Sequence, residues 1–367
     1  MTSPTSPTRT RFALVGAGVI GRHHGRVMAE LGDRIELAAV VDVHRDRAQG
    51  VAADHGAQTF TSLADALAAT DVEVVSICTP TGTHGSVAIE ALRAGKHVII
   101  EKPAEVTPAK TDEIIAAQRA AGTQVAVISQ HRFDPSTEIA VAAIAEGKLG
   151  RLTSGIASID WWRSQRYYDS GDWRGTWELD GGGALMNQGV HTVDLLVATM
   201  GRPIEVFAYT GTLAHERIET EDVAVGVVRF ENGALGVLHA TTAAYPGLSA
   251  RLQVHGDRGS VIIDDDQLTF IHATPPDSDW KEEPGDLQNT AINQVDDYRD
   301  GLRSSPTAGS RPSGLSTDAH KRQYENFLEA LAGREPLRVD LETNRQAISI
   351  IVGVYESART GQPVRLR

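Results

Sequence analysis

The sequence is poor in cysteine and in long apolar runs. Cys78 is the single cysteine among 367 residues, which excludes a disulfide framework and a metal site built from several thiolates. Because Cys78 stands in an apolar run, we expect it to be a small buried hydrophobic side chain. No apolar stretch approaches the roughly 18–20 residues that a membrane-spanning helix needs. The sequence therefore predicts neither disulfide bonds nor a membrane span.

The sequence also has fewer basic than acidic residues. The 35 Lys and Arg residues stand against 48 Asp and Glu residues, and the formal net charge is −13. A surface of this sign repels the phosphates of nucleic acids and of anionic lipids, so we expect neither nucleic acid nor a membrane as a partner. Residues 1–10 are rich in Ser, Thr and Pro and lack an apolar segment. They predict a disordered tail rather than a signal peptide, and hence a cytoplasmic protein.

Short apolar runs alternate with helical patterns in the first third of the chain. The runs lie at residues 12–16, 35–42, 73–80, 97–103 and 124–130. Continuous Val and Ile runs separated by helices are typical of a parallel sheet covered on both faces. We therefore predict the α/β fold class, with a doubly wound Rossmann domain over residues 11–132.

Residues 133–367 have a different pattern. An apolar helix is expected at about 184–200, and strand-like runs follow at 204–213, 222–230, 234–243, 250–256 and 259–266. The short polar turns between these runs carry hairpin signals, so we predict an α+β domain with a large, mainly antiparallel open sheet. Residues 274–316, rich in Pro, Asp, Ser and Gly, predict a surface excursion. Two helices, at about 317–332 and 342–360, close this domain.

A glycine-rich turn links the first strand to the first helix. Gly16 makes the tight turn, Gly18 lets a pyrophosphate approach the backbone, and Gly21 allows the helix to pack on the strand. The helix N-terminus that follows can hold phosphates through its unpaired N–H groups. Asp42 ends the next strand about 20 residues further on, as the dinucleotide fingerprint requires. Together these residues predict a dinucleotide site.

Asp42 also bears on which dinucleotide binds. Its carboxylate would accept the adenine-ribose hydroxyls of NAD and repel a 2′-phosphate by up to roughly 4 kcal/mol at about 4 Å. His44 and Arg45 could offset this repulsion, so the sequence favours NAD over NADP without excluding NADP. His23 and His24 lie just inside the helix and point in different directions. We expect a solvated helix face there, and no metal site in the chain.

Further motifs make the sequence resemble one family. They are Gly16–Gly21, Thr79-Pro80 with His84, Ala94–Val98 leading into Glu101-Lys102-Pro103, and Gly181–Gly183 followed by His191–Asp194. From about Arg11 to its C-terminus the chain resembles the glucose–fructose oxidoreductase / inositol dehydrogenase / MocA-type family of NAD(P)-dependent sugar oxidoreductases. The resemblance implies a cis peptide between Lys102 and Pro103. It also implies cofactor contacts at Gly16, Gly18, Val19, Ile20, Gly21, Asp42, Val43, Thr79, Pro80, His84, Glu101, Lys102, Gln130, Trp173 and Arg174.

Two residues of these motifs suit the oxidation of a secondary alcohol, which sends a hydride to nicotinamide and a proton to a base. Lys102 stands at the carboxyl end of a parallel strand, where such sheets bind ligands, and its ammonium would stabilise a developing alkoxide. His191 is the expected base, because histidine titrates near neutral pH. The alternatives are a solvated strand-end charge and a buried helix histidine. We expect both residues to be catalytic and to bind substrate.

Position 187 departs from the family, whose commonest arrangement has Asp four residues before the histidine. Asn187 shares a helical face with His191 and can hold a substrate hydroxyl, but it cannot act as a base. We therefore expect Asn187 to place the substrate in the catalytic site. Asp194 either orients the His191 ring or caps a backbone group, and the sequence leaves both open.

Aromatic residues make up 5% of the chain, yet four of the five tryptophans fall between Trp161 and Trp177. Rings interleaved with hydrogen-bond donors suit a pyranose, and packing of this loop onto the sheet is the alternative. Three arginines in the loop would also suit an anionic substrate such as a nucleotide-linked sugar or a uronate. Arg163 and Tyr168 are the substrate contacts expected from this loop.

These observations predict an NAD-dependent dehydrogenase acting on a ring hydroxyl or ketone of a sugar, an inositol or a sugar derivative. A redox-neutral glycoside hydrolase or lyase that uses bound NAD is one alternative. A sugar sensor that binds NAD without turnover is another. The family resemblance also implies a homodimer or homotetramer formed through the C-terminal sheet, with a small carbohydrate or polyol as substrate.

Overall fold

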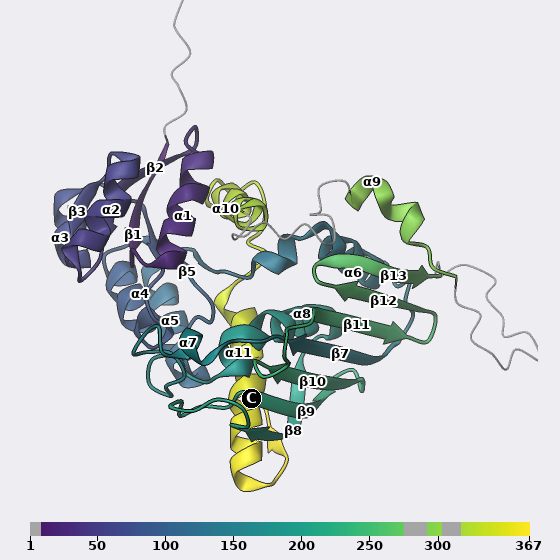
Figure 1. Cartoon of the computed structure of the whole chain (residues 1–367). Helices are drawn as coiled ribbons and strands as arrows, with labels where there is room; N and C mark the ends of the chain where they lie inside the picture. The colour runs from purple at the N-terminus through teal and green to yellow at the C-terminus, as the bar shows by residue number, and fades with distance from the viewer. Residues whose placement is uncertain (1–8, 275–291, 303–316) are drawn as a thin grey trace, which may run out of the picture. The chain divides into compact units, whose positions relative to one another are not determined.

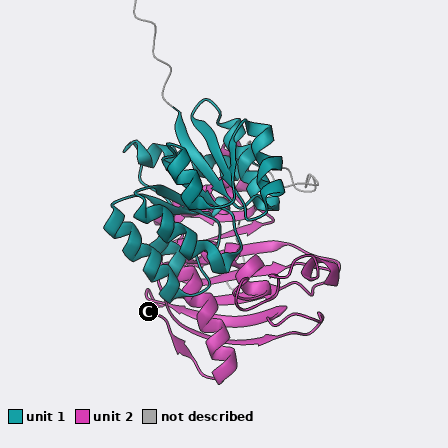
Figure 2. Cartoon of the chain, turned by 90° about the vertical axis from the view of Figure 1, so that its left-hand side faces the viewer, with its two compact units in different colours: residues 1–130, 313–345 teal, residues 131–312, 346–367 magenta. Residues whose placement is uncertain are grey.

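The chain divides into two compact units, which Figure 2 shows in different colours. The computed structural model describes residues 9–274, 292–302 and 317–367. The first unit combines residues 1–130 with 313–345, and the second combines residues 131–312 with 346–367. This division differs from the predicted continuous domain over 133–367. The helix α10 (Asp318–Leu331) belongs to the first unit because Tyr324 and Phe327 are buried in the core of that unit.

The first unit is built on a six-stranded parallel sheet in the order β3-β2-β1-β4-β5-β6 (Figure 1). Its strands are β1 (Thr10–Val15), β2 (Ile35–Val41), β3 (Gln58–Phe60), β4 (Val74–Ile77), β5 (His97–Ile100) and β6 (Val125–Val127). Its helices besides α10 are α1 (Val19–Glu30), α2 (Arg45–His55), α3 (Leu63–Ala69), α4 (His84–Arg93) and α5 (Pro108–Ala121). The predicted doubly wound parallel sheet is confirmed. β3 escaped the prediction because three residues are too few to form an apolar run.

The second unit is built on an eight-stranded sheet in the order β13-β12-β11-β7-β10-β9-β8-β14. Its strands are β7 (Leu152–Asp160), β8 (Pro203–Gly211), β9 (Val223–Phe230), β10 (Leu235–Thr241), β11 (Ala250–Gly256), β12 (Gly259–Asp264), β13 (Gln267–Ala273) and β14 (Val364–Arg365). β7 and β10 run parallel, and the other described neighbours are antiparallel. The predicted mainly antiparallel sheet is therefore confirmed.

The strand β13 was not predicted, and its turn explains why. Asp265 and Asp266 link β12 to β13 with φ angles of 47° and 64°. Two-residue hairpin turns of this hand favour glycine, and no glycine marks this one. Asp is among the residues that tolerate a positive φ, so the hairpin forms without its usual sequence signal.

Helices pack on one face of the eight-stranded sheet, namely α6 (Pro135–Ala145) and a π-helix (Ala184–Gly189) continued by α8 (Val190–Met200). The remaining described α-helices are α7 (Gln165–Tyr168), α9 (Arg299–Leu302), which packs on α6, and α11 (Leu341–Thr360). Gly155 of β7 lies so close to Leu196 and Met200 of α8 that a Cβ there would come within about 3 Å of both side chains. Along β9 and β10, buried and exposed residues alternate. One face of these strands is therefore core and the other is open.

Part of two predictions lies outside the described residues. The predicted tail over residues 1–10 is described only from Arg9, and Thr10 already belongs to β1. Of the predicted excursion over residues 274–316, the described part contains a 3₁₀ helix (Val295–Tyr298) and α9. Among the residues that the structure describes, no helix combines the length and the apolar character needed to cross a membrane.

The glycine turn after β1 has the geometry that its sequence predicts. Gly16 has a φ of 95°, and a Cβ there would lie 2.5 Å from the Cys78 carbonyl oxygen. A Cβ at Gly21 would lie 1.9 Å from the Gly16 carbonyl oxygen. A Cβ at Gly18 would meet no atom within 4 Å. Gly16 and Gly21 are therefore needed by the fold itself, whereas Gly18 leaves open space in front of the helix N-terminus.

We expect Gly21→Ala and Gly18→Ala to differ sharply in stability. The Gly21 variant places a methyl group against a backbone oxygen and should lower the free energy of unfolding by roughly 3 kcal/mol. The Gly18 variant should cost less than about 1 kcal/mol, since its backbone is extended and its surroundings are open. Chemical denaturation of both variants measures this difference, and equal losses would contradict the geometry.

Candidate functional site

Asp42 lies beside the glycine turn at the carboxyl edge of the parallel sheet. Its Oδ2 accepts the Ala17 N–H at 2.8 Å, and its Oδ1 accepts the His44 N–H at 2.8 Å. Two apolar side chains near it are unusually open: Val19 is 81% exposed and Val43 is 82% exposed. The predicted residues Gly16–Gly21, Asp42 and Val43 therefore gather at the ends of β1 and β2, where this fold class binds dinucleotides.

His84 joins two loops at the same edge of the sheet. Its Nε2 lies 2.8 Å from the Thr79 carbonyl oxygen, and its Nδ1 lies 2.8 Å from the Pro103 carbonyl oxygen. The ring is buried, so its visible role is to connect the Thr79-Pro80 turn to the loop that follows β5. A direct contact of His84 with a cofactor stays a prediction. Gln130 follows β6 and begins the 3₁₀ helix Gln130–Phe133.

The Lys102 loop is fixed at both of its sides. The Lys102–Pro103 peptide is cis, as the family resemblance implies. The Lys102 N–H donates to Glu101 Oε2 at 3.0 Å. The Ala104 N–H donates to the side-chain oxygen of Asn344 at 3.1 Å. The backbone that carries Lys102 is therefore held by side chains on each side of it.

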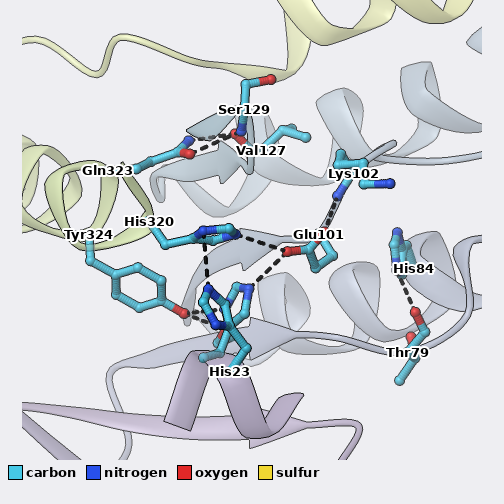
Figure 3. A network of polar contacts seen from close by, with 12 residues as sticks. His23, Thr79, His84, Glu101, Lys102, Val127, Ser129, His320, Gln323 and Tyr324 are labelled. Carbon is cyan, nitrogen blue, oxygen red and sulfur yellow. Dashed lines mark hydrogen bonds and ion pairs between the residues drawn. The ribbon is translucent and has the colours of Figure 1, made fainter. Parts of the chain in front are cut away.

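The expectation of a solvated face at His23 and His24 is wrong. Both rings are fully buried, because α10 packs against α1 and carries His320 and Tyr324 (Figure 3). His24 Nδ1 lies 2.7 Å from the Tyr324 hydroxyl, and His23 Nε2 lies 3.2 Å from His320 Nδ1. Nothing in the local pattern around residue 23 indicates that a segment 297 residues away returns to it.

His24 and Glu101 form a buried ion pair, with His24 Nε2 2.8 Å from Glu101 Oε1. Burial lowers the pKa of His24, but Cys78, Tyr324 and Glu101 together outweigh it and hold this pKa well above its ordinary value. Burial raises the pKa of Glu101, but the hydrogen bond from His24 and the nearby His320 hold it well below its ordinary value. Burial lowers the pKa of His23 to about 3. His24 is therefore cationic, Glu101 anionic and His23 neutral at pH 7.

His191 stands at the start of α8 in the second unit, next to a second polar cluster. Its ring meets the His131 ring edge to face, with the ring centres 5.0 Å apart. His131 Nδ1 lies 2.8 Å from Asp134 and 3.0 Å from Asp266. Burial lowers the pKa of His131, but Asp266 and Asp134 hold it well above its ordinary value. An imidazolium therefore lies beside His191, a feature that the sequence did not reveal.

Two groups of side chains have a spacing that could hold a metal ion. They are His24, Glu101 and His320 in the first unit, and His131, Asp134 and Asp266 in the second. Within each group the candidate ligand atoms lie within 4.8 Å of one another. Both groups are already joined by hydrogen bonds or ion pairs. The absence of a metal stays a prediction.

Asp194 takes neither of the two roles that the sequence left open. Its Oδ2 accepts from Arg132 Nε at 2.6 Å, and its Oδ1 accepts from Arg132 Nη2 at 2.7 Å. This bidentate pairing of a guanidinium with a carboxylate is a strong form of ion pair. It ties the helix that carries His191 to the first residues of the second unit.

Asn187 lies in the π-helix, with an acid beside it. Its Nδ2 donates to Asp180 Oδ1 at 2.5 Å, and its Oδ1 accepts from Gln188 at 2.8 Å. Asp180 is buried, and its Oδ2 accepts the Gly175 N–H. Position 187 has no carboxylate of its own, but the Asp180 carboxylate, seven residues upstream, lies beside it.

Arg163 and Tyr168 of the aromatic loop lie in different surroundings. The Arg163 guanidinium lies over the Trp161 ring at 5.0 Å and the Tyr167 ring at 5.4 Å, and it donates to the side-chain oxygen of Gln188 at 3.0 Å. Tyr168 is buried, and its hydroxyl lies 2.7 Å from the Thr242 hydroxyl. Tyr167 belongs to the polar network around Arg163, and a contact of Tyr168 with substrate stays a prediction.

Trp173 and Arg174 are stacked, with the guanidinium 4.4 Å from the indole ring. Arg174 also lies over the Tyr167 ring at 4.2 Å and donates to its hydroxyl at 2.6 Å. The pair is therefore ordered within its own loop. Contact of Trp173 and Arg174 with a cofactor stays a prediction.

Glu221 supports the turn that leads into the π-helix, and sequence reasoning missed it. Its carboxyl oxygens accept from the Gly183 N–H at 2.9 Å, the Leu185 N–H at 2.8 Å and the Tyr355 hydroxyl at 3.0 Å. A Cβ at Gly183 would lie 1.8 Å from the Glu221 carbonyl oxygen. Burial raises the pKa of Glu221 to about 7. No local motif marks Glu221, which lies 38 residues from Gly183.

Glu221 should make stability depend on pH. A carboxyl whose pKa rises on folding stabilises the protein below its unfolded pKa, and that contribution is lost as the pH rises through about 7. The wild type should therefore lose about 2 kcal/mol relative to Glu221→Gln between pH 5 and pH 8. Denaturant titrations at both pH values measure it, with Glu219→Gln as the exposed control. A difference that is constant with pH would refute the role of burial.

Comparison with known proteins agrees with this arrangement. Residues 10–129 match the model of the oxidoreductase family with an NAD-binding Rossmann fold, and residues 138–262 match the GFO/IDH/MocA C-terminal domain. The myo-inositol 2-dehydrogenase of Thermotoga maritima is 28% identical over 97% of this chain and 98% of its own. The D-glucoside 3-dehydrogenase of Escherichia coli is 26% identical, with both chains fully covered.

Solved structures extend this likeness to the whole chain. The WlbA dehydrogenase from Bordetella pertussis, crystallised with NADH and UDP-GlcNAcA, is 32% identical with a TM-score of 0.85, covering 99% of each chain. Its counterpart from Chromobacterium, in complex with the same two compounds, is also 32% identical, with a TM-score of 0.84 over 100% of this chain and 99% of its own. The chain therefore belongs to the GFO/IDH/MocA family of oxidoreductases, with an NAD-binding Rossmann domain at its N-terminus.

Proposed function

We propose that this protein is an NAD-dependent dehydrogenase that oxidises a ring hydroxyl of a nucleotide-linked uronic acid sugar. The observation that carries the proposal is the place of Arg163, whose cation lies over two aromatic rings and joins the Asn187–Gln188 network. Rings suit the apolar face of a sugar, and a guanidinium suits a carboxylate or a phosphate. The two 32%-identical structures hold a UDP-linked ligand, UDP-GlcNAcA, which supports this class.

When bound, the nicotinamide of NAD would accept the hydride that leaves the alcohol carbon as its C–H bond breaks. The hydroxyl proton goes to His191, and the Lys102 ammonium stabilises the alkoxide as it forms. Asn187 holds a second hydroxyl of the ring. Asp180 orients the Asn187 amide through its 2.5 Å hydrogen bond, which supports a placing role without a base at position 187.

For the cofactor, we propose that Asp42 accepts the adenine-ribose hydroxyls. Both of its oxygens are already oriented by backbone N–H groups, and each retains a lone pair for a further donor. The exposed Val19 and Val43 side chains would flank the adenosine. The remaining proposed contacts are Ile20, Thr79, Pro80, His84, Glu101, Gln130, Trp173 and Arg174. A cytoplasmic location likewise stays a prediction.

We expect NADH to form when the protein meets NAD and UDP-linked uronic acids. Lys102→Ala should lower kcat by at least about 10²-fold while the dissociation constant of NADH stays within about threefold. Lys96→Ala is the matched control, because Lys96 lies at the opposite end of the same strand β5. Absorbance at the NADH band and fluorescence titration of NADH measure the two quantities.

Other outcomes of this assay would favour other functions. NADH formed with free inositols or neutral sugars, but not with UDP-uronates, would contradict the proposed substrate class. Cleavage of an aryl glycoside without net NADH would point to a redox-neutral hydrolase. Tight NAD binding without turnover on any sugar would point to a sensor. Undiminished turnover in Lys102→Ala would remove Lys102 from the mechanism.

The open face of the eight-stranded sheet supports a proposed homo-oligomer. Val225 and Val227 of β9 and Leu235 and Val237 of β10 are exposed. Val227 lies opposite Val237 in the ladder, so these side chains form one apolar stripe across neighbouring strands. Exposed apolar stripes of this kind mark interaction surfaces. We propose that a second copy of the chain covers it.

Light scattering should give the wild type the mass of a dimer or a tetramer of the 39.3 kDa chain. The double variant Val227→Glu, Val237→Glu should shift it to the monomer mass at the same concentration, since two charges cannot be buried without partners. Val141→Glu makes the same exchange at an exposed residue of α6 and should leave the mass unchanged. A monomeric wild type would overturn the proposal.

A further inference from the structure

The first unit contains a charged cluster in which two members, His24 and His320, have no role in the proposed reaction. Glu101 and His320 lie close together (Figure 3), and His24 reaches the same carboxylate from a third segment; all three residues are buried. Glu101 Oε1 lies 2.8 Å from His24 Nε2 and 3.9 Å from His320 Nε2. The second oxygen, Oε2, accepts the backbone N–H of Lys102. One carboxylate therefore links two helices to the Lys102 loop.

Donors and acceptors around this cluster match one another. A cationic His24 ring donates from Nε2 to Glu101 and from Nδ1 to the Tyr324 hydroxyl. The Tyr324 hydroxyl lies 2.8 Å from Ser76 Oγ, so it can accept from His24 and donate to Ser76. His23, neutral, can donate from Nε2 to His320 Nδ1. Each donor thus has an acceptor: His24 donates to Glu101 from one nitrogen and to the Tyr324–Ser76 pair from the other, while His23 donates to His320.

The cluster bears on Lys102 through the backbone. A buried carboxylate that loses its partner is strongly disfavoured, so removing His24 would force Glu101 to take up a proton or to move. Either change alters the acceptor of the Lys102 N–H. Figure 3 shows the Lys102 side chain directed away from the cluster, so only its backbone is held there. A small displacement of a catalytic group is enough to slow the chemistry.

We propose that the cluster of His24, Glu101 and His320 positions Lys102 for hydride transfer. His24 and His320 are then positioning residues that act through Glu101. The inference rests on the proposed catalytic role of Lys102. It gives α10 a part in the reaction, because α10 supplies His320 and the Tyr324 hydroxyl that orients His24.

The test compares His24→Gln, Glu101→Gln and the double variant with Gln323→Ala. Gln323 also ties α10 to the end of β6, through the Ser129 N–H at 2.9 Å and the Val127 carbonyl oxygen at 2.7 Å, and within the described residues it makes no hydrogen bond to Glu101. Each single cluster variant should lower kcat at least tenfold, and in His24→Gln, which is no proposed cofactor contact, the NADH dissociation constant should stay within about threefold. The double variant should be no slower than Glu101→Gln alone, since coupled residues are not additive.

Gln323→Ala should lower the unfolding midpoint and keep kcat within about twofold of the wild type. If Gln323→Ala and the cluster variants lose kcat equally, the cluster acts only by holding α10 in place, and the proposal is overturned. Additive losses in the double variant would also overturn it. Elemental analysis could also find close to one transition metal ion per chain that is lost in His320→Ala. The three residues would then be metal ligands, and the proposed positioning role would be overturned.

A second readout does not depend on the substrate. Reductive ¹³C-methylation labels the six lysines of the chain, and Lys102→Ala identifies the Lys102 resonance. His24→Gln and Glu101→Gln should each shift the Lys102 resonance and leave the other lysine resonances in place. Gln323→Ala should not shift the Lys102 resonance. An unmoved Lys102 resonance in both cluster variants would overturn the proposal. If the wild type turns over no substrate, the proposed function fails, but this measurement still decides the role of the cluster.

Discussion

The Glu101 carboxylate lies inside the first unit, where an unpaired charge costs several kcal/mol. The unit meets this constraint by bringing His24 from α1 and His320 from α10 to the same oxygen. The other oxygen holds the backbone of Lys102. The packing of α10, the burial of two histidines in α1 and the geometry of the loop after β5 therefore all bear on how this one charge is paired.

Much of the fold could be predicted because its signals are local. Val and Ile runs mark most strands of the parallel sheet, and Gly16 and Gly21 occupy positions where the backbone leaves no room for a side chain. The predictions failed where the local signal is weak. β3 is three residues long, and the β12–β13 hairpin turns through Asp265 and Asp266 without a glycine. The return of α10 to the first unit depends on packing, which no local pattern reports.

The candidate site could be predicted less completely, for the same physical reason. Motifs located Asp42, Lys102, Asn187 and His191, but the partners of such residues are set by the folded chain. Arg132 pairs with Asp194 across 62 residues of sequence. The buried carboxyl of Glu221 supports the turn before Asn187. Long-range contacts of this kind determine which charges are paired, and sequence spacing does not contain them.

The first unit is assembled from two stretches of chain, residues 1–130 and 313–345, and this has a consequence during protein synthesis. The N-terminal stretch leaves the ribosome before the helix that carries Tyr324 and Phe327 exists, although both rings belong to its core. Until that helix is made, the apolar face of α1 and the Glu101 charge lack part of their cover. Nascent chains with such exposed surface are prone to aggregate and need chaperones. The unit that begins the sequence therefore cannot complete its core until residues 313–345 have been made.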